Sequence, residues 1–160
     1  DSTINSNRLD CLYITLPSEK DLTDTEAAIN HAIELGIRDI TVYGGIGGRL
    51  DHTLGNVGLL EKYLGKLDHL EFMDEKNSMQ LLDGETCSST ILTPVSTYRF
   101  FSLVSLDSAA EGVSITGAKY NLDNASISRA STLCISNEII LNQAHISLHR
   151  GKVLLVRSAD

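Results

Sequence analysis

A glycine-rich segment with three chemically active side chains lies between positions 44 and 52. It reads Gly-Gly-Ile-Gly-Gly-Arg-Leu-Asp-His and follows the short apolar run 40–43. Glycines admit positive φ and allow a ligand close to the backbone, and the N-terminus of a following helix attracts anions, most often phosphate. Arg49 can bind phosphate oxygens through two N–H groups, and Asp51 can hold a metal ion or cap the helix. The segment predicts a phosphate-binding turn; the alternative is a tight strand-to-helix connection with Asp51 as N-cap.

A second polar group, Lys-Asp-Leu-Thr-Asp-Thr-Glu, begins at Lys20 and precedes an amphipathic segment. Asp21 and Asp24 are three positions apart at a helix start, and carboxylate pairs of this kind suit Mg²⁺, which also leaves room for substrate phosphates. Lys20 would neutralise phosphate charge. Thr23 and Glu26 equally fit a helix capping box, so the residues alone leave both a metal site and a cap open.

A third candidate is the small polar pair Ser136-Asn137 in the second half of the chain. Hydroxyl and amide groups can orient a heterocyclic ligand by hydrogen bonds. Serine and asparagine also favour ordinary turns, which is the alternative for this pair.

Composition narrows the classes of partner. The 160 residues carry a net charge of −8, which argues against a sequence-independent surface for nucleic acid or an anionic membrane. No apolar run is long enough to span a bilayer, and no apolar secretory segment stands at the start. Cys11, Cys87 and Cys134 lie far apart, so we expect three reduced, mostly buried thiols in a cytoplasmic protein.

The elements that must position these groups fall into two patterns. Residues 9 to about 83 alternate apolar runs with segments of helical period, which predicts parallel strands joined by helices, with ligands beyond the carboxyl ends of the strands. Both polar groups, 20–24 and 44–51, are expected at those ends. The expected strands are 12–16, 39–43 and 70–73, and the expected helices begin near residues 24 and 50 and end before Gly36 and Gly65.

From about Met79 the helical period is lost, and short apolar runs alternate with turn residues; the expected domain boundary is Asp83-Gly84. Many closely spaced strands predict a small antiparallel sandwich or barrel. The expected strands are 85–92, 98–106, 112–115, 126–127, 133–135 and 139–141, followed by a hairpin of 145–149 with 152–156. The predicted fold class is therefore α/β plus all-β: a Rossmann-like parallel α/β domain over residues 1–83, followed by a small antiparallel β-sandwich domain over residues 84–160.

Five motifs follow one another along the chain: Asp1-Ser2; Lys20-Asp21-x-Thr23-Asp24; Gly44-x-x-Gly47-Gly48-Arg49-x-Asp51-His52; Gly117-x-x-Tyr120-x-Leu122; and Ser131-Thr132-Leu133-Cys134-Ile135-Ser136-Asn137-Glu138. In type, order and spacing they closely resemble bacterial thiamine pyrophosphokinases, over essentially the whole chain. The resemblance implies a homodimer with an N-terminal α/β domain, a C-terminal β domain and sites near the subunit contact. It implies transfer of pyrophosphate from ATP to the thiamine hydroxyl, which yields AMP and thiamine diphosphate.

The resemblance also assigns roles to individual residues. It implies Mg²⁺ as the cofactor, held by Asp1, Asp21 and Asp24, and it implies catalytic roles for Asp24, Arg49 and Asp51. It implies substrate contacts from seven further residues, with the last two supplied by the partner subunit: Lys20, Thr23, Gly47, Gly48, His52, Ser136 and Asn137. Because the chain has no Trp, Tyr120 or an apolar wall would stack on the thiamine ring.

The family pattern begins with a further strand–helix unit and a Gly-Asp-x-Asp-Ser motif, of which Asp1 and Ser2 are the last two residues. We therefore expect that the α/β domain is truncated at its N-terminus. The competing interpretation is a catalytically incomplete relative or fragment that binds thiamine diphosphate or a nucleotide.

Overall fold

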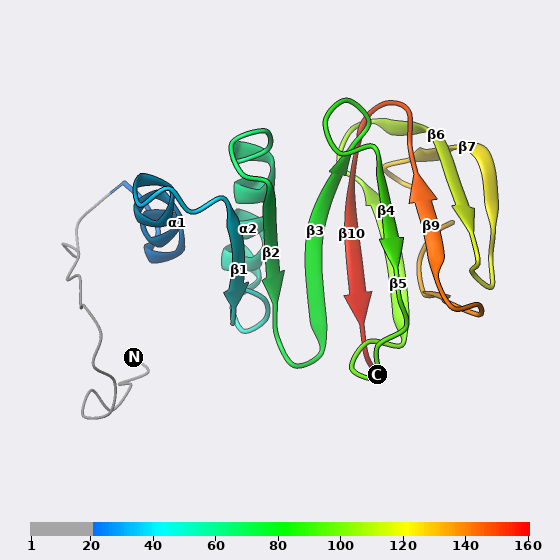
Figure 1. Ribbon diagram of the computed structural model, residues 1–160, viewed down its shortest axis with the longest axis horizontal. Helices are drawn as coiled ribbons and strands as arrows, with labels where there is room; N and C mark the ends of the chain where they lie inside the picture. Colours follow the sequence, from blue (N-terminus) through cyan, green and yellow to red (C-terminus); the bar gives the residue numbers. More distant parts are fainter. Residues whose placement is uncertain (1–20) are drawn as a thin grey trace.

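The computed structural model describes residues 21–160 (Figure 1). This part of the chain forms two helices and ten strands, and the strands are arranged in two sheets. The helices are α1 (Asp24–Glu34) and α2 (Leu50–Lys62). The strands are β1 (Asp39–Tyr43), β2 (His69–Met73), β3 (Asn77–Asp83), β4 (Ser89–Leu92), β5 (Phe100–Ser105), β6 (Ala109–Thr116), β7 (Leu122–Ser128), β8 (Asn137–Glu138), β9 (Ala144–Ser147) and β10 (Lys152–Ser158).

The first half follows the helical and strand periods of the sequence. Thr23 caps α1, because its hydroxyl accepts a hydrogen bond from the backbone N–H of Glu26 at 3.2 Å. Gly36, at φ +83°, ends this helix as expected. Strands β1 and β2 pair in parallel, with α2 as the connection between them. The expected β–α–β unit is therefore present, and it includes the glycine-rich segment between β1 and α2.

Strand β3 was missed by the sequence reasoning, and it joins the two halves. It pairs antiparallel with β2 on one side and with β10 on the other, within a six-stranded sheet of order β1-β2-β3-β10-β5-β8. Both faces of β3 are covered: Leu81 packs in the cluster under the helices, and its neighbour Leu82 packs in the cluster between the two sheets. A strand that is buried on both sides lacks the polar alternation by which strands are recognised.

The second sheet has the order β4-β9-β6-β7 and is antiparallel throughout. Its inner side chains and those of the larger sheet form one apolar cluster, so the two sheets pack face to face. The larger sheet contributes Leu82, Phe101, Leu103, Val153 and Leu155, and the smaller sheet contributes Leu92, Val113, Ile115, Ile127 and Ile146.

The expected hairpin near the C-terminus is wrong. Strand β9 pairs with β4 and β6, whereas β10 pairs with β3 and β5, so the chain crosses from one sheet to the other through residues 148–151. Ala144 and Ile146 of β9 and Val153 and Leu155 of β10 enter the same core from opposite sheets, and β10 buries its other face under the helices through Leu154. Alternation and a glycine turn are compatible with either arrangement, so local sequence cannot separate a hairpin from a crossing.

Two further strand predictions differ from the structure. Residues 133–135 form a turn, in which the N–H of Ile135 donates to the carbonyl of Thr132 at 3.2 Å, and not a strand. No strand forms at 139–141, where Ile139 makes one isolated bridge with Ala118; the two-residue β8 (Asn137–Glu138) directly precedes it. The strand expected at 12–16 lies outside the described residues.

Candidate functional site

The glycine-rich segment forms a tight loop between the end of β1 and the start of α2. Gly44, Gly47 and Gly48 have φ values of +83°, +88° and +65°, a region that side chains disfavour. The N–H of Gly44 donates to the carbonyl of Met73 at 2.8 Å, which ties the loop to the end of β2. The N–H of Gly47 donates to the Thr53 hydroxyl at 3.2 Å. The loop therefore has a fixed shape at the carboxyl edge of the parallel strands.

Two buried side chains set the depth of this loop. The amide of Asn56, on the buried face of α2, donates to the carbonyl of Gly45 at 2.7 Å. A Cβ on Gly45 would lie 2.5 Å from Cδ1 of Phe72, a fully buried ring on β2. Gly45 is thus required by close packing, and Asn56 holds the loop against the sheet.

Arg49 and Asp51 form a two-pronged ion pair at the start of α2. The Arg49 Nε lies 3.1 Å from Oδ1 of Asp51, and Nη2 lies 2.5 Å from Oδ2. The hydrogen bond from Arg49 is the largest influence on Asp51 and lowers the pKa of its carboxyl group. Asp51 is not the N-cap: Arg49 occupies that position without a side-chain cap, and Asp51 lies in the first turn.

The N-terminal end of α2 has the chemistry of an anion-binding site. The first N–H groups of a helix have no partner within the helix, and they carry the positive end of the helix dipole. Gly48, Arg49 and His52 are exposed there. The loop can therefore offer backbone donors and a guanidinium to a phosphate, with Asp51 holding the guanidinium in place.

The first turn of α1 lies away from this loop. The Glu26 carboxylate forms an ion pair with Lys62, in the last turn of α2, and the Tyr63 hydroxyl donates to Asn30 at 2.6 Å. The start of α1 is thus near the C-terminal end of α2, whereas the glycine loop precedes its N-terminal end, about 20 Å along a 13-residue helix. Figure 1 shows α1 beside the amino end of β1.

This placement corrects the expectation that both polar groups lie beyond the carboxyl ends of the strands. Asp21, Thr23 and Asp24 are exposed at the start of α1, and the structure does not bring them to the glycine loop. Thr23 does serve as the cap that was its alternative interpretation. Asp1 and Lys20 lie outside the described residues.

Ser136 and Asn137 lie at the other edge of the large sheet, where β8 pairs with β5. Five strand spacings separate β8 from β1, about 24 Å in total. Asn137 is buried; its amide donates to the carbonyl of Tyr120 at 2.7 Å and accepts the N–H of Tyr120 at 3.0 Å. Asn137 therefore fixes the backbone at Tyr120, whose ring is exposed. Ser136 is exposed at φ +58°.

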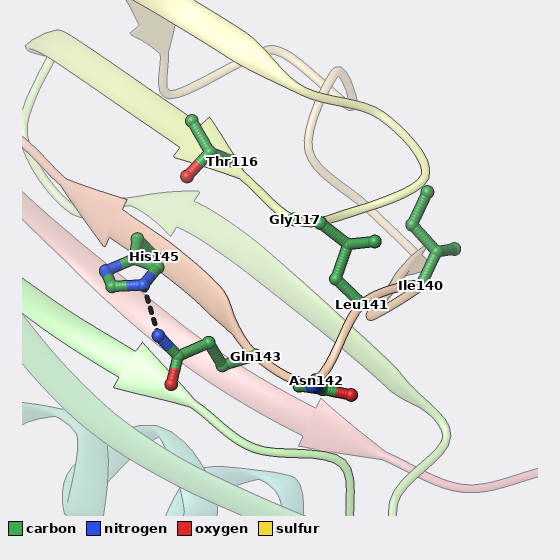
Figure 2. Close-up of a pocket in the computed structure, with 7 residues that line it drawn as sticks. All are labelled: Thr116, Gly117, Ile140, Leu141, Asn142, Gln143 and His145. Atoms are coloured by element: carbon green, nitrogen blue, oxygen red, sulfur yellow. Dashed lines mark hydrogen bonds between the residues drawn. The ribbon is translucent and has the colours of Figure 1, made fainter.

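An open cavity of about 840 Å³ lies near this edge of the β half (Figure 2). Ile140 and Leu141 form an exposed apolar wall, and the amide of Gln143 contacts the ring of His145 at 2.7 Å. The cavity is open to solvent and has both apolar and polar walls.

Three residues of the loop region were missed by sequence reasoning: Thr53, Asn56 and Asp74. Thr53 and Asn56 reach the loop because α2 turns back over it. Asp74 reaches it from the end of β2, where its Oδ2 lies 3.7 Å from the position of a Cβ on Gly47. The available signals were a buried polar residue on the apolar face of α2 and an acid directly after the next strand.

Other expectations have mixed outcomes. Cys134 is buried, which raises the pKa of its thiol to about 11, whereas Cys87 is exposed; both are free thiols, and Cys11 lies outside the described residues. Neither helix of the described region is long and apolar enough to cross a membrane.

Comparison with known proteins identifies the family. Residues 2–71 match the model of the thiamin pyrophosphokinase catalytic domain, and residues 88–153 match the model of the thiamin pyrophosphokinase vitamin B1 binding domain. The chain is 33% identical over 143 residues to the thiamine pyrophosphokinase of Bacillus subtilis, a match that covers 89% of this chain and 65% of that protein.

Solved structures give the same result. The crystal structure of the Bacillus subtilis thiamine pyrophosphokinase superposes with a TM-score of 0.81 at 32% identity, covering 89% of this chain and 65% of the other. That of the Geobacillus thermodenitrificans protein superposes with a TM-score of 0.79 at 38% identity, covering 90% and 65%. The chain thus spans 65% of the length of these relatives. Both domain models in their order and the shared fold show that this chain belongs to the thiamine pyrophosphokinase family.

Proposed function

We propose that this protein is a thiamine diphosphokinase, which transfers pyrophosphate from ATP to the hydroxyl of thiamine. The observation that carries the proposal is the match to both domain models of one family, in sequence order, over 2–71 and 88–153. The rigid glycine loop at the carboxyl edge of the parallel strands supports it, because such a loop is suited to nucleotide phosphates.

In the proposed reaction the thiamine oxygen forms a bond to the β-phosphorus of ATP. The bond between that phosphorus and the oxygen bridging to the α-phosphorus breaks, and AMP leaves. Transfers of this type depend mainly on positioning and on neutralisation of charge. Gly47, Gly48 and His52 would contact the phosphates, and Arg49, oriented by Asp51, would stabilise charge on the leaving side. Asp24 is the proposed acceptor of the hydroxyl proton, a role that requires it to reach the glycine loop from the far end of α2, where the described structure places it.

Mg²⁺ is the proposed cofactor, and the carboxylates of Asp1, Asp21 and Asp24 are its proposed ligands, with Lys20 and Thr23 against the substrate. Carboxylate oxygens suit this ion, which typically takes one or two of them together with substrate phosphates. Within residues 21–160 no group of three such side chains converges on one point. Magnesium bound there would neutralise phosphate charge. The described structure places Asp24 at the opposite end of α2 from the glycine loop.

The placement of Ser136 and Asn137 supports a homodimer. These residues and the glycine loop of the same chain lie at opposite edges of one sheet. A site that contains both groups would therefore combine two subunits. We propose that these two residues of the partner chain face the thiamine ring, and that Tyr120 serves as its stacking surface.

The proposed organisation is a Rossmann-like parallel α/β domain over residues 1–83 and a β-sandwich domain over residues 84–160. The parallel pair of β1 and β2 around α2 supports the first, and the face-to-face packing of the two sheets supports the second. The proposed location is the cytoplasm, in keeping with free thiols at Cys87 and Cys134.

A binding protein without catalysis is the second candidate, and the distance of Asp24 from the loop favours it. One assay separates the two functions: formation of AMP and thiamine diphosphate from ATP, Mg²⁺ and thiamine. The 160-residue chain is compared with a chain extended at its N-terminus through the Gly-Asp-x-Asp-Ser motif, and Asp24→Asn is the inactivating control in each.

Equal formation of both products by either chain, abolished by Asp24→Asn and by chelation of Mg²⁺, is the expected result. Activity only in the longer chain would keep the proposed reaction and place an essential ligand in the added segment. Binding of thiamine diphosphate without turnover in both chains would replace the enzyme by the binding protein.

A further inference from the structure

Asp74 follows the last residue of β2 and lies next to the glycine loop. Its Oδ2 is 3.7 Å from the position that a Cβ would occupy on Gly47. The loop after β1 and the first residue after β2 are neighbours because these two strands pair in parallel, in register from Asp39 with His69 to Tyr43 with Met73. The side chain therefore faces the loop across adjacent strand ends.

The two carboxylate oxygens of Asp74 have different surroundings. Oδ1 accepts the backbone N–H groups of Lys76 at 2.7 Å and Asn77 at 2.6 Å, and the Asn77 amide at 3.4 Å. No residue within 21–160 donates a hydrogen bond to Oδ2. The turn is fixed further by the Tyr98 hydroxyl, which donates to the carbonyl of Asp74 at 2.8 Å. One oxygen thus holds the turn, and the other is held toward the loop, where no donor from residues 21–160 occupies it.

A fixed carboxylate beside a phosphate-binding loop favours some groups of a nucleotide and disfavours others. It repels phosphate oxygens, because like charges close together raise the energy of both. It accepts strongly from a neutral hydroxyl, since hydrogen bonds to a charged acceptor are about twice as strong as neutral ones. In a nucleotide whose phosphates lie on the loop, the neutral donors nearest to the phosphates are the ribose hydroxyls.

We propose that Oδ2 of Asp74 accepts a hydrogen bond from a ribose hydroxyl of the nucleotide, and so makes this protein selective for ribonucleotides. The proposal rests on the proposed function, in which the glycine loop holds ATP. The glycine loop follows one parallel strand, and Asp74 follows the strand beside it. The phosphates and the sugar of one nucleotide can therefore lie on adjacent strand ends. Asp74 is then a specificity-determining residue.

The test compares ATP with 2′,3′-dideoxyATP, which keeps the base and the phosphates and lacks both hydroxyls. Binding of each is measured by calorimetry, and turnover with thiamine is measured in parallel on the active form of the chain. The variants are Asp74→Asn and Asp74→Ser, which both keep an acceptor for the turn. Asp68→Asn, just before the other end of β2, is the matched control.

The wild type and Asp68→Asn are expected to prefer ATP by on the order of tenfold or more. Both Asp74 variants are expected to lose most of that preference by binding ATP less tightly, with the dideoxy affinity unchanged. Thermal unfolding of each variant shows whether the turn at Asp74 is intact. If Asp74→Ser unfolds, the comparison of the two nucleotides is made with Asp74→Asn alone.

An equal loss for both nucleotides would reduce Asp74 to a turn cap and overturn the proposal. So would an altered Mg²⁺ requirement with the sugar preference intact, which would make Asp74 a metal ligand. A wild type that converts ATP and dideoxyATP equally well would refute ribose recognition while the proposed function stands. Failure of the wild type to bind either nucleotide would refute both.

Discussion

The absence of a side chain at Gly45 sets the distance between the glycine loop and the sheet. A Cβ at this position would overlap the Phe72 ring, which is fully buried and packed between β2 and the helices. We expect Gly45→Ala to lower the free energy of unfolding by about 1–3 kcal/mol, because the backbone or the ring must shift. The loop would move with it, so nucleotide binding would weaken as well.

The matched control is Gly55→Ala in the exposed part of α2, where an added Cβ meets nothing within 4 Å. That change is expected to stabilise the protein by about 0.5–1 kcal/mol, through helix propensity. Urea unfolding of the two variants measures both effects. Equal stability of the two variants would show that Phe72 does not constrain the loop.

The ion pair of Arg49 and Asp51 predicts a pH effect with a definite sign. The hydrogen bond from Arg49 lowers the pKa of the Asp51 carboxyl group. A lowered pKa in the folded state means that the contribution of this pair is present above the ordinary aspartate pKa and is lost as the pH falls through the lowered value. The stability effect is small because both side chains are exposed.

NMR titration of the Asp51 carboxyl measures this directly. Its midpoint is expected below that of ordinary aspartates, and Arg49→Ala is expected to return it to that range. The wild-type and variant proteins are titrated under the same conditions, so that the comparison is internal to Asp51. A midpoint that is insensitive to Arg49→Ala would mean that the two side chains do not pair in solution.

At the level of elements, α2 links the glycine loop to the core. The Asn56 amide holds the Gly45 carbonyl, and loss of that donor leaves a part-buried carbonyl without its partner. We expect Asn56→Ala to cost about 1–3 kcal/mol of stability. Because the loop becomes looser, we also expect the KM for ATP to rise several-fold while the KM for thiamine changes little.

Asn30→Ala on α1 is the control for this prediction. It removes the acceptor of the Tyr63 hydroxyl and thus has a comparable structural cost, but it does not touch the loop. Steady-state kinetics and thermal unfolding of both variants separate the two effects. If both variants raise the KM for ATP alike, the Asn56 contact is only structural.

The whole molecule is organised around one continuous sheet with two apolar clusters. Adjacent residues of β3 and of β10 point alternately into the cluster under the helices and the cluster between the sheets. The glycine loop and the Ser136-Asn137 pair are at opposite edges of that sheet. The geometry of a single chain keeps them apart, which gives the proposed dimer a testable consequence.

Mixing two inactive variants tests whether sites are shared between subunits. Arg49→Ala removes the cation at the loop, and Ser136→Asp places a charge at the other edge, in a backbone conformation that aspartate tolerates. If each site combines both groups from different chains, random mixing of the subunits is expected to restore about a quarter of the wild-type activity. The form of the chain that is active in the assay above is used.

The controls are each variant alone and a mixture in which one chain carries both changes and the other carries neither. A mixture of the single variants that stays as inactive as its components would show that each site lies within one chain. Native mass spectrometry, which resolves the small mass differences between the variants, confirms that mixed dimers have formed.

Local sequence determined the two helices and the parallel strands of the first half, but not β3, and it determined the character of the glycine loop. The helices α1 and α2, their glycine ends and the strands β1 and β2 follow from residue spacing and caps, which depend only on neighbours a few positions away. The motifs also led to the right family, because their order along the chain is itself a property of the sequence.

Tertiary structure decided what depends on contacts between distant residues. It placed β9 and β10 in different sheets, although the two runs and the glycine turn between them fit a hairpin. It brought Asn56 and Asp74 to the glycine loop, and it kept the start of α1 at the other end of α2. The energies that settle these choices come from burial and pairing across the fold, and no short stretch of the chain contains both partners.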